Sequence, residues 1–253
     1  MKVSLITGTF NSGRTLQDTI DSVAKQDHKD IEYIIVDGGS TDDTLEVIRR
    51  NSERITKWKS EPDLGIYDAM NKGLRMATGD IVGIINSDDF YHRKDSISII
   101  VKYLKEYKTD CVFGDVIFVD PNDTNKMTRY FSSKKFHPSK FKFGFIPAHP
   151  TFFTYRSNFE KYGLYKVDYK IAADFELLFR FLYIHKLSFQ YIPQALLKMR
   201  TGGVSTSSIQ STFVIMKENR RAFKENGRYT NYLFLLIRYF YKIFQFMPSI
   251  RKI

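Results

Sequence analysis

The sequence predicts an α/β fold in which helices flank a mostly parallel sheet. Through the first half of the chain, short β-branched runs alternate with segments of helical periodicity, as they do when crossover helices join parallel strands. The run at 81–85 is almost unbroken in its apolar character, which is typical of a strand buried on both faces. A chain of 253 residues is long enough for one such domain with a small appendage.

The first ninety residues carry the clearest signals. Strands are expected at 2–7 and 31–36. Between them, a helix is indicated by Leu16, Ile20, Val23 and Ala24, which share one face. A capping box from Ser40 to Asp43 is expected to open the next helix. A stripe with the helical period then predicts a further helix and consists of Ile66, Ala69, Met70, Gly73, Leu74 and Ala77.

Beyond Asp89 the pattern is looser. Helices are expected at 96–107, 174–185 and 205–225, and strands at 111–119 and 189–192. The stretch 126–145 is basic and aromatic, and we expect hairpins of a mixed sheet and a long loop there.

The composition describes a globular and strongly basic chain. An apolar share of 43% excludes a disordered protein, and a net charge of +11 indicates an anionic partner. The single cysteine, Cys111, cannot form an internal disulfide, which favours a reducing compartment. We find no export signal and no run of about 20 apolar residues in the sequence. A cytoplasmic protein is therefore expected.

The C-terminal part of the chain is basic and aromatic. From Thr201 onward it contains nine Lys or Arg residues and two Glu residues. Within 229–247, one helical face carries Asn231, Arg238, Lys242 and Gln245. This pattern predicts an amphipathic helix in an anionic membrane interface, with its cations toward the headgroups. The alternative is a helix that docks on the rest of the protein or lies in a dimer seam.

Aspartates follow two of the predicted strands. Asp37 ends the second strand, and Asp88 and Asp89 end the fourth. The carboxyl ends of parallel strands meet at one edge of a sheet, where ligands bind, and Gly38 and Gly39 would let a ligand approach the backbone. Adjacent carboxylates repel each other unless a cation is near. The pair therefore predicts a Mn²⁺ or Mg²⁺ site beside a diphosphate, and the alternative is that it only caps the following helix.

Four successive segments resemble blocks of glycosyltransferase family 2, in the order and at the spacing of that family. They are 4–11, 36–44, 61–73 and 77–89, and the last contains Asn-Ser-Asp-Asp in the place of the family's DXD-type motif. The resemblance continues through 149–152, 172–176 and 202–205. It thus covers about residues 1–205.

The resemblance implies a GT-A fold with a Rossmann-like sheet, and inverting transfer of the type found in cell-surface polysaccharide biosynthesis. Asp89 would be the direct ligand of the metal. A carboxylate at Asp37 can accept the imide N–H of uracil, which suits a UDP-sugar donor. An arginine that is common near Met70 in relatives is missing. The donor-binding residues that the resemblance implies are Thr9, Phe10, Asn11, Asp37, Asp63, Lys72 and Asp88.

Asp174 is the candidate general base. Inverting transfer needs a carboxylate beside the acceptor hydroxyl, on the face opposite the leaving nucleotide. Many relatives carry Glu-Asp here, whereas this chain has Ala173-Asp174. A helix N-cap is an alternative role for Asp174 that can coexist with the first. Glu176 is a second candidate, but two residues along a helix it would point elsewhere.

Two further residues are expected near the acceptor or the phosphates. His149 precedes an apolar strand and would contact the acceptor, the donor phosphate or the metal. The alternative is a hydrogen-bonded structural histidine. Gly203, with Gly202 and Ser205, is expected to form a mobile loop that closes over the donor, and a simple turn is the alternative.

Together, these inferences predict a metal-dependent hexosyl- or N-acetylhexosaminyltransferase. The acceptor is expected to be a lipid-linked saccharide, reached from the inner face of the cell membrane. A catalytic domain would span 1–205, with a nucleotide-binding half at 1–90 and an acceptor-binding half at 91–205, and 206–253 would associate with the membrane. The alternatives are a metal-dependent nucleotidyltransferase and a basic nucleic-acid-binding protein without enzymatic activity. Because no nucleic-acid-binding motif is present, we expect no such partner, and a homo-oligomer stays open.

Overall fold

The computed structural model describes residues 1–202 and 209–245, with the side chains of 1–202 and 210–238. Its centre is a nine-stranded sheet of order β3-β2-β1-β4-β8-β6-β9-β5, and β7 pairs with β6 outside this path. The strands are β1 (Val3–Thr9), β2 (Ile31–Asp37), β3 (Lys57–Ser60), β4 (Ile81–Ile84), β5 (Phe90–Tyr91), β6 (Cys111–Val119), β7 (Met127–Phe131), β8 (Phe153–Tyr155) and β9 (Phe189–Arg200).

The sheet is parallel in its first half and mixed in its second. β1 pairs in parallel with both β2 and β4, and β2 does so with β3. β8 then lies antiparallel between β4 and β6, and β6 pairs in parallel with β9. The parallel arrangement expected for the first ninety residues is confirmed. Of the hairpins expected within 126–145, the structure forms one, in which β7 pairs antiparallel with the preceding strand β6, and 138–143 form η2 instead.

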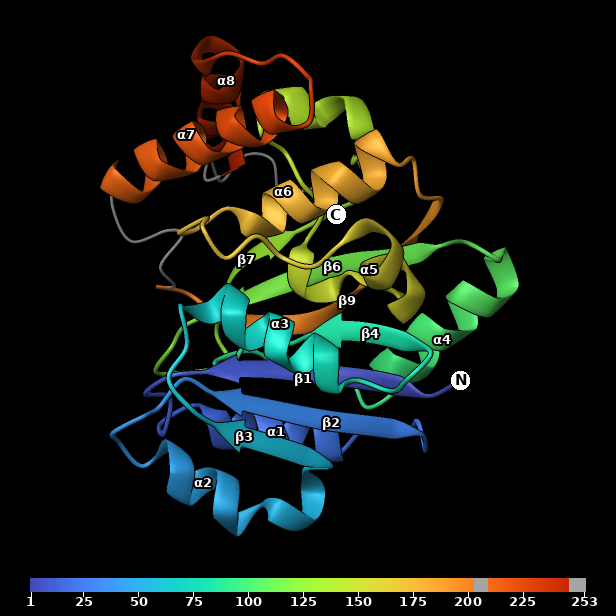
Figure 1. Ribbon diagram of the computed structural model, residues 1–253, viewed down its shortest axis with the longest axis vertical. Helices are drawn as coiled ribbons and strands as arrows, with labels where there is room; N and C mark the ends of the chain where they lie inside the picture. The colour runs from blue at the N-terminus through green and yellow to red at the C-terminus, as the bar shows by residue number, and fades with distance from the viewer. Residues whose placement is uncertain (203–208, 246–253) are drawn as a thin grey trace.

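Helices cover both faces of the sheet, as Figure 1 shows. Since successive strand residues point to opposite faces, Leu5 and Ile35 join one core and Ile6 and Ile34 join the other. The first core is closed by α1 (Leu16–Ala24), α2 (Thr44–Arg50) and α4 (Ser96–Tyr107). The second is closed by α3 (Ile66–Met76), α5 (Arg156–Tyr162) and α6 (Ala173–Phe179). α6 continues as a π-helical turn, η4 (Arg180–Ile184), and short 3-10 helices lie at η1 (Ser52–Arg54), η2 (Pro138–Phe143) and η3 (His149–Thr151).

Two local expectations are wrong. The capping box does not form, because α2 begins at Thr44 and the Ser40 hydroxyl instead donates to Asp37. The last strand is also much longer than 189–192, since β9 extends to Arg200 along the full length of β6. Pro193 and Gln194 interrupt the apolar pattern after Ile192, and the pairing with β6 reveals the rest of this strand.

Two C-terminal helices, α7 (Ile209–Glu225) and α8 (Tyr232–Gln245), lie at the end of the molecule opposite α2 (Figure 1). One side of α8 docks on the loop around η2, where Leu235 is 1% exposed and the Arg238 guanidinium donates to the Gly144 carbonyl at 2.9 Å. The orientation expected for Arg238 is therefore wrong, because this cation faces the protein. None of the helices in the described ranges is long and apolar enough to cross a membrane.

Candidate active site

The carboxyl ends of β1, β2 and β4 bring most of the expected donor-site residues to one edge of the sheet. Thr9 and Asp37 are direct partners in the parallel register of β1 and β2. The segment after β1 contacts the segment after β4, since the hydroxyl oxygens of Ser12 and Ser87 lie 2.8 Å apart. The aspartates of two strands therefore lie at the same edge, as the sequence indicates.

Asp37 organises the loop that follows β2. Its carboxylate is 0% exposed and accepts hydrogen bonds from the backbone of Ser40 at 3.0 Å and from the Ser60 hydroxyl at 2.7 Å. The Ser40 hydroxyl and the Gly39 backbone also donate to it. In this structure Asp37 therefore holds the loop in place through these hydrogen bonds, and its contact with a nucleobase stays a prediction.

The residues at the end of β1 and just after it lie opposite the loop that follows β2. Asn11 has a positive φ of 50°, and its side-chain oxygen accepts from the Thr41 backbone at 2.9 Å. This contact ties the loop after β1 to the loop after β2. Phe10 is exposed, whereas the Thr9 hydroxyl is buried and has no hydrogen-bond partner among the described residues. An aromatic ring and an unpaired hydroxyl thus flank the strand ends.

Asp63 lies directly against the Gly38 backbone. A Cβ atom added to Gly38 would come within 2.5 Å of the Asp63 carboxylate, so only glycine allows this approach. Asp63 is half-buried, and its other oxygen accepts from the Gly65 backbone at 2.8 Å, just before α3 begins. The structure therefore brings Asp63 to the end of β2.

Lys72 is less available than the sequence suggests. Its ammonium lies 3.2 Å from Glu61 and 3.3 Å from Asp68, and it donates to the Pro62 carbonyl at 3.0 Å. These two carboxylates already balance its charge. A second cation at this edge is Arg200.

Arg200 ends β9 and was missed by the sequence analysis. Its side chain is 9% exposed, and its guanidinium donates to the Asp88 backbone carbonyl at 2.6 Å. It also pairs with Asp18 and lies over the Phe90 ring, 5.1 Å from the ring centre. The available signal was an arginine placed two residues before a Gly-Gly pair.

Asp88 and Asp89 have different environments. Asp88 is half-buried, while Asp89 is 1% exposed. Burial raises the pKa of both carboxyls, and the neighbouring charge of Asp88 raises the pKa of Asp89 further. They do not cap the following helix, because α4 begins seven residues later, at Ser96, and its N-cap residue is Asp95. The capping alternative is therefore excluded.

The residues at this position fit a divalent cation. Asp89 Oδ2 accepts from Asn86 at 2.9 Å, but Oδ1 is buried and has no partner among the described residues. A buried carboxylate oxygen that has no hydrogen-bond partner and lies next to a second carboxylate would be stabilised by a nearby cation. Within residues 1–202 and 209–245, no three His, Cys, Asp or Glu side chains gather as a complete ligand set. A cation held here would complete its shell with donor phosphate and water oxygens.

Asp174 lies in the first turn of α6 and is half-buried. Its Oδ1 accepts from the Phe175 backbone at 2.7 Å. The N-cap residue of α6 is Ala172, so the expectation that Asp174 might be the N-cap is wrong. Tyr67 and Tyr165 lie nearby: burial raises the pKa of both phenols, and the negative charge of Asp174 raises it further.

His149 is a buried, hydrogen-bonded histidine. Its Nε2 lies 2.7 Å from the Tyr165 hydroxyl, and the two rings meet edge to face. Burial lowers the pKa of His149, and the charge of Asp174 offsets part of this effect. This environment matches the structural alternative and places the imidazole within the electrostatic reach of the candidate base.

Glu176 cannot act as the second candidate base in this structure. It is 0% exposed and pairs with Arg180 at 2.9 Å and with Lys166 at 3.3 Å. Its carboxylate is therefore part of the core, as its position two residues from Asp174 indicated. Gly203 lies outside the described residues, while Gly202 has a positive φ of 107°.

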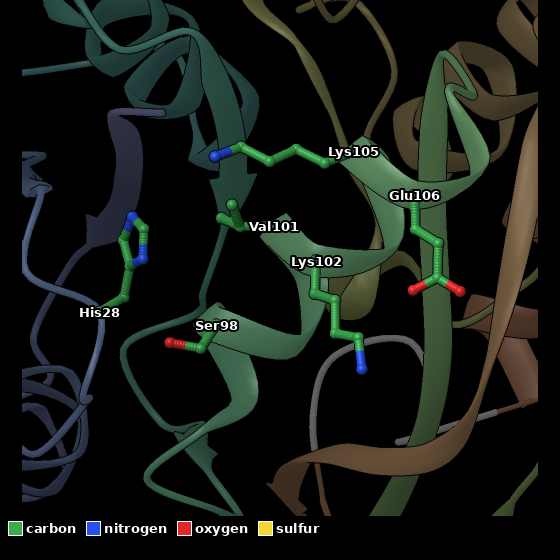
Figure 2. Close-up of a pocket in the computed structure, with 6 residues that line it drawn as sticks. All are labelled: His28, Ser98, Val101, Lys102, Lys105 and Glu106. Carbon is green, nitrogen blue, oxygen red and sulfur yellow. The ribbon is translucent and has the colours of Figure 1, made fainter.

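A separate hollow of about 550 Å³ lies beside α4. Figure 2 shows His28 across from side chains of α4, and the hollow is lined by His28, Ser98, Val101, Lys102, Lys105 and Glu106. His28 precedes β2, and Lys105 and Glu106 precede β6. The hollow therefore lies toward the amino ends of the strands, away from the aspartates.

Comparison with known proteins identifies relatives over most of the chain. The model of the family described as Glycosyl transferase family 2 matches residues 4–163. A PGL/p-HBAD biosynthesis glycosyltransferase of Mycobacterium tuberculosis is 29% identical over 217 residues, which are 83% of this chain and 82% of that protein.

Two solved structures share the fold. The crystal structure of TarS from S. aureus covers 98% of this chain with a TM-score of 0.71 and 18% identity, and the match spans only 44% of TarS. TarS 1–349 is also known in complex with UDP-GlcNAc. A mannosyltransferase from Pyrobaculum calidifontis, in complex with GDP-Man and Mn²⁺, covers 91% of this chain with a TM-score of 0.66 and 20% identity, and the match spans 65% of that protein. These similarities show a GT-A fold.

Proposed function

The chain belongs to glycosyltransferase family 2, and from this premise we propose that it transfers a hexosyl or N-acetylhexosaminyl group from UDP to an acceptor hydroxyl. The observation that carries the proposal is the contrast among the carboxylates of this region. Asp63, Asp88 and Asp174 are half-buried and accessible, Asp89 is buried with one unpaired oxygen, and Asp37 and Glu176 are buried with their carboxylates engaged by the protein. The nucleotidyltransferase and nucleic-acid-binding alternatives are set aside because the family is that of a glycosyltransferase.

The donor would lie across the ends of β1, β2 and β4. Phe10 offers an exposed ring for the base, and the Thr9 hydroxyl and Asp63 offer polar contacts at the same edge. We propose Asp88 for the ribose and Asp89 for a Mn²⁺ or Mg²⁺ ion, in keeping with its unpaired oxygen. A bound divalent cation would stabilise the charge that develops on the departing diphosphate.

Asp174 would act on the acceptor side. Its carboxylate would accept a hydrogen bond from the acceptor hydroxyl and take its proton as the oxygen attacks the anomeric carbon. The bond from that carbon to the diphosphate breaks at the same time, and its electron pair leaves with UDP. Direct displacement inverts the configuration and requires base and leaving group on opposite sides of the carbon.

The exposed side of α8 supports a peripheral location at an anionic membrane. Leu233 is 71% exposed, and Leu236 and Ile237, three and four residues further on, are also exposed. Such spacing puts the three side chains on one helical face. Basic residues lie close in sequence, at Lys224 and Arg228. We propose that this face contacts the inner face of the cell membrane and that the acceptor is a lipid-linked saccharide.

Nucleotide binding measured by calorimetry tests the proposed donor site. UDP and GDP would each be titrated with and without Mn²⁺ into the natural protein and into Asp89→Ala. Asp30→Ala is the matched control, since Asp30 is an exposed aspartate just before β2, at the opposite edge of the sheet. We expect Mn²⁺-dependent binding of UDP that only Asp89→Ala abolishes. Folded natural protein that binds neither nucleotide would refute the proposal.

A further inference from the structure

Glu218 of α7 holds the segment that leads into α6. Its carboxylate is 7% exposed and accepts hydrogen bonds from three consecutive backbone amides. The distances are 2.6 Å to Lys170, 3.0 Å to Ile171 and 2.8 Å to Ala172. Asp174 follows two residues later. A side chain from the C-terminal helices thus fixes the backbone directly before the candidate base.

The local sequence cannot supply this anchor itself. The N-cap residue of α6 is Ala172, which has no side-chain acceptor. Backbone N–H groups at the start of a helix lack intrahelical partners and favour a nearby negative charge. Glu218, 46 residues further along the chain than Ala172, supplies such a charge from another helix, at the amides of the N-cap residue and of the two residues before it.

The same segment is held from its other side by α3. The Tyr67 hydroxyl donates to the Ile171 carbonyl, so both polar groups of the Ile171 backbone are engaged. Tyr67 is itself buried, and it follows Gly65 and Asp63 of the donor edge by two and four residues. The backbone before Asp174 therefore lies between the donor half and α7.

Further contacts run along one face of α7. Arg221 pairs with Asp168, and Glu225 accepts from the Tyr169 hydroxyl at 2.9 Å. Residues 218, 221 and 225 lie on one helical face because they are spaced by three and four positions. Figure 1 shows α7 lying beside α6. α7 thus contacts the segment from 168 to 172 along nearly two turns.

We infer that Glu218 is a positioning residue, which sets the place of Asp174 through the backbone of 170–172. This inference rests on the proposed function, because it requires Asp174 to be the base. A carboxylate must be placed to within a fraction of an ångström to take a proton in the transition state. A displacement of about 1 Å can lower a rate by on the order of 100-fold. The Glu218 carboxylate is engaged by the backbone amides of 170–172, so it would affect rate and leave donor binding unchanged.

The test compares Glu218→Gln with the natural protein, Asp174→Asn and Lys217→Gln. Glutamine keeps the shape but presents an NH₂ group to a backbone N–H. Lys217 is the exposed neighbour on the same helix and serves as control. UDP-GlcNAc with Mn²⁺ is the probe: UDP release in the absence of an acceptor reports the attack of water, which needs the same base. UDP affinity and the amide hydrogen exchange of 170–172 are measured in parallel.

We expect Glu218→Gln to lower UDP release about tenfold or more, to keep UDP affinity within about twofold and to speed exchange at 170–172. The last two readouts separate positioning from a general loss of structure. Unchanged UDP release by Glu218→Gln, with Asp174→Asn inactive, overturns this inference alone. Unchanged release by Asp174→Asn overturns the assignment of the base and the inference together. If Glu218→Gln does not fold, Glu218→Asp, which keeps the charge but shortens the reach, is tested with the same expectations.

Discussion

Asn71 and Tyr165 are joined by two hydrogen bonds that connect α3 to the segment leading into α6. The Asn71 side chain donates to the Tyr165 carbonyl at 2.8 Å, and the Tyr165 backbone donates back to the Asn71 side chain at 2.9 Å. Asn71 lies on α3 beside the donor edge, and Tyr165 precedes the segment that carries Asp174. The Tyr165 hydroxyl in turn contacts His149. Through these hydrogen bonds, the segment that leads to the candidate base is attached to the helix beside the candidate donor site.

Replacement of Asn71 by Ala should destabilise the protein. Asn71 is buried, so alanine would leave the Tyr165 amide and carbonyl without partners. Unsatisfied buried groups of this kind cost about 1–3 kcal/mol each. We expect the free energy of unfolding, measured by urea denaturation, to fall by about 2–4 kcal/mol. A change below about 0.5 kcal/mol would show that the pair does not hold α3 to the segment around Tyr165.

Asp174→Asn and Glu176→Gln should separate catalysis from stability. Asp174→Asn removes the candidate base and should lower the rate of transfer or of UDP release about 10²–10⁴-fold, with UDP affinity preserved. Glu176→Gln breaks a fully buried ion pair with Arg180, so its main effect should be a loss of about 3 kcal/mol in unfolding free energy. UDP release and urea denaturation of both variants check this. A Glu176→Gln protein of natural stability but without activity would reverse the two assignments.

Gly38→Ala should weaken donor binding while the protein stays folded. The added methyl group would meet the end of the Asp63 side chain at 2.5 Å, and that side chain can move. We expect stability to change by less than about 1 kcal/mol and UDP affinity to fall by about tenfold. Gly73→Ala is a contrasting variant, because its Cβ would lie 2.3 Å from Ile6 in the core. That change should cost about 1–3 kcal/mol in stability.

Stability should fall in acid partly because of His149. Burial lowers the pKa of His149 below its ordinary value of 6.5, so the folded protein holds it neutral while the unfolded chain binds a proton. The stability that this difference contributes is complete above about pH 6.5 and is lost as the pH falls toward the folded pKa. His149→Gln can keep a hydrogen bond to Tyr165. It should reduce the slope of the unfolding free energy against pH by up to about 1.4 kcal/mol per pH unit. Urea denaturation between pH 5 and 8 measures the difference, and parallel curves for both proteins would contradict it.

The exposed face of α8 should mediate membrane association. Leu233→Glu with Ile237→Glu places two negative charges on that face and should abolish flotation with phosphatidylglycerol vesicles. Tyr107→Glu, at an exposed position on α4, is the control. Association of the natural protein should weaken as salt is raised, because exposed charges are screened. A double variant that still floats, or one that only turns a dimer into a monomer, would refute the membrane role.

The sequence by itself determined the family, the α/β fold and the edge of the sheet that carries the candidate donor-site residues. Short, local patterns indicate these features: β-branched runs, the helical stripe from Ile66 to Ala77, and aspartates at strand ends. The strand register, which places Thr9 opposite Asp37, came from the structure. Local patterns are readable because each depends on residues a few positions apart.

Only the tertiary structure decided which polar groups are free and which are engaged. Asp174 and Glu176 are two residues apart, yet one is accessible and the other forms a buried ion pair with Arg180. Arg200 reaches Asp88 across 112 residues, and Glu218 reaches Ala172 across 46. Burial and pairing of this kind depend on which distant segments pack together, because a carboxylate's neighbours set its solvation and its hydrogen bonds. No local pattern encodes them.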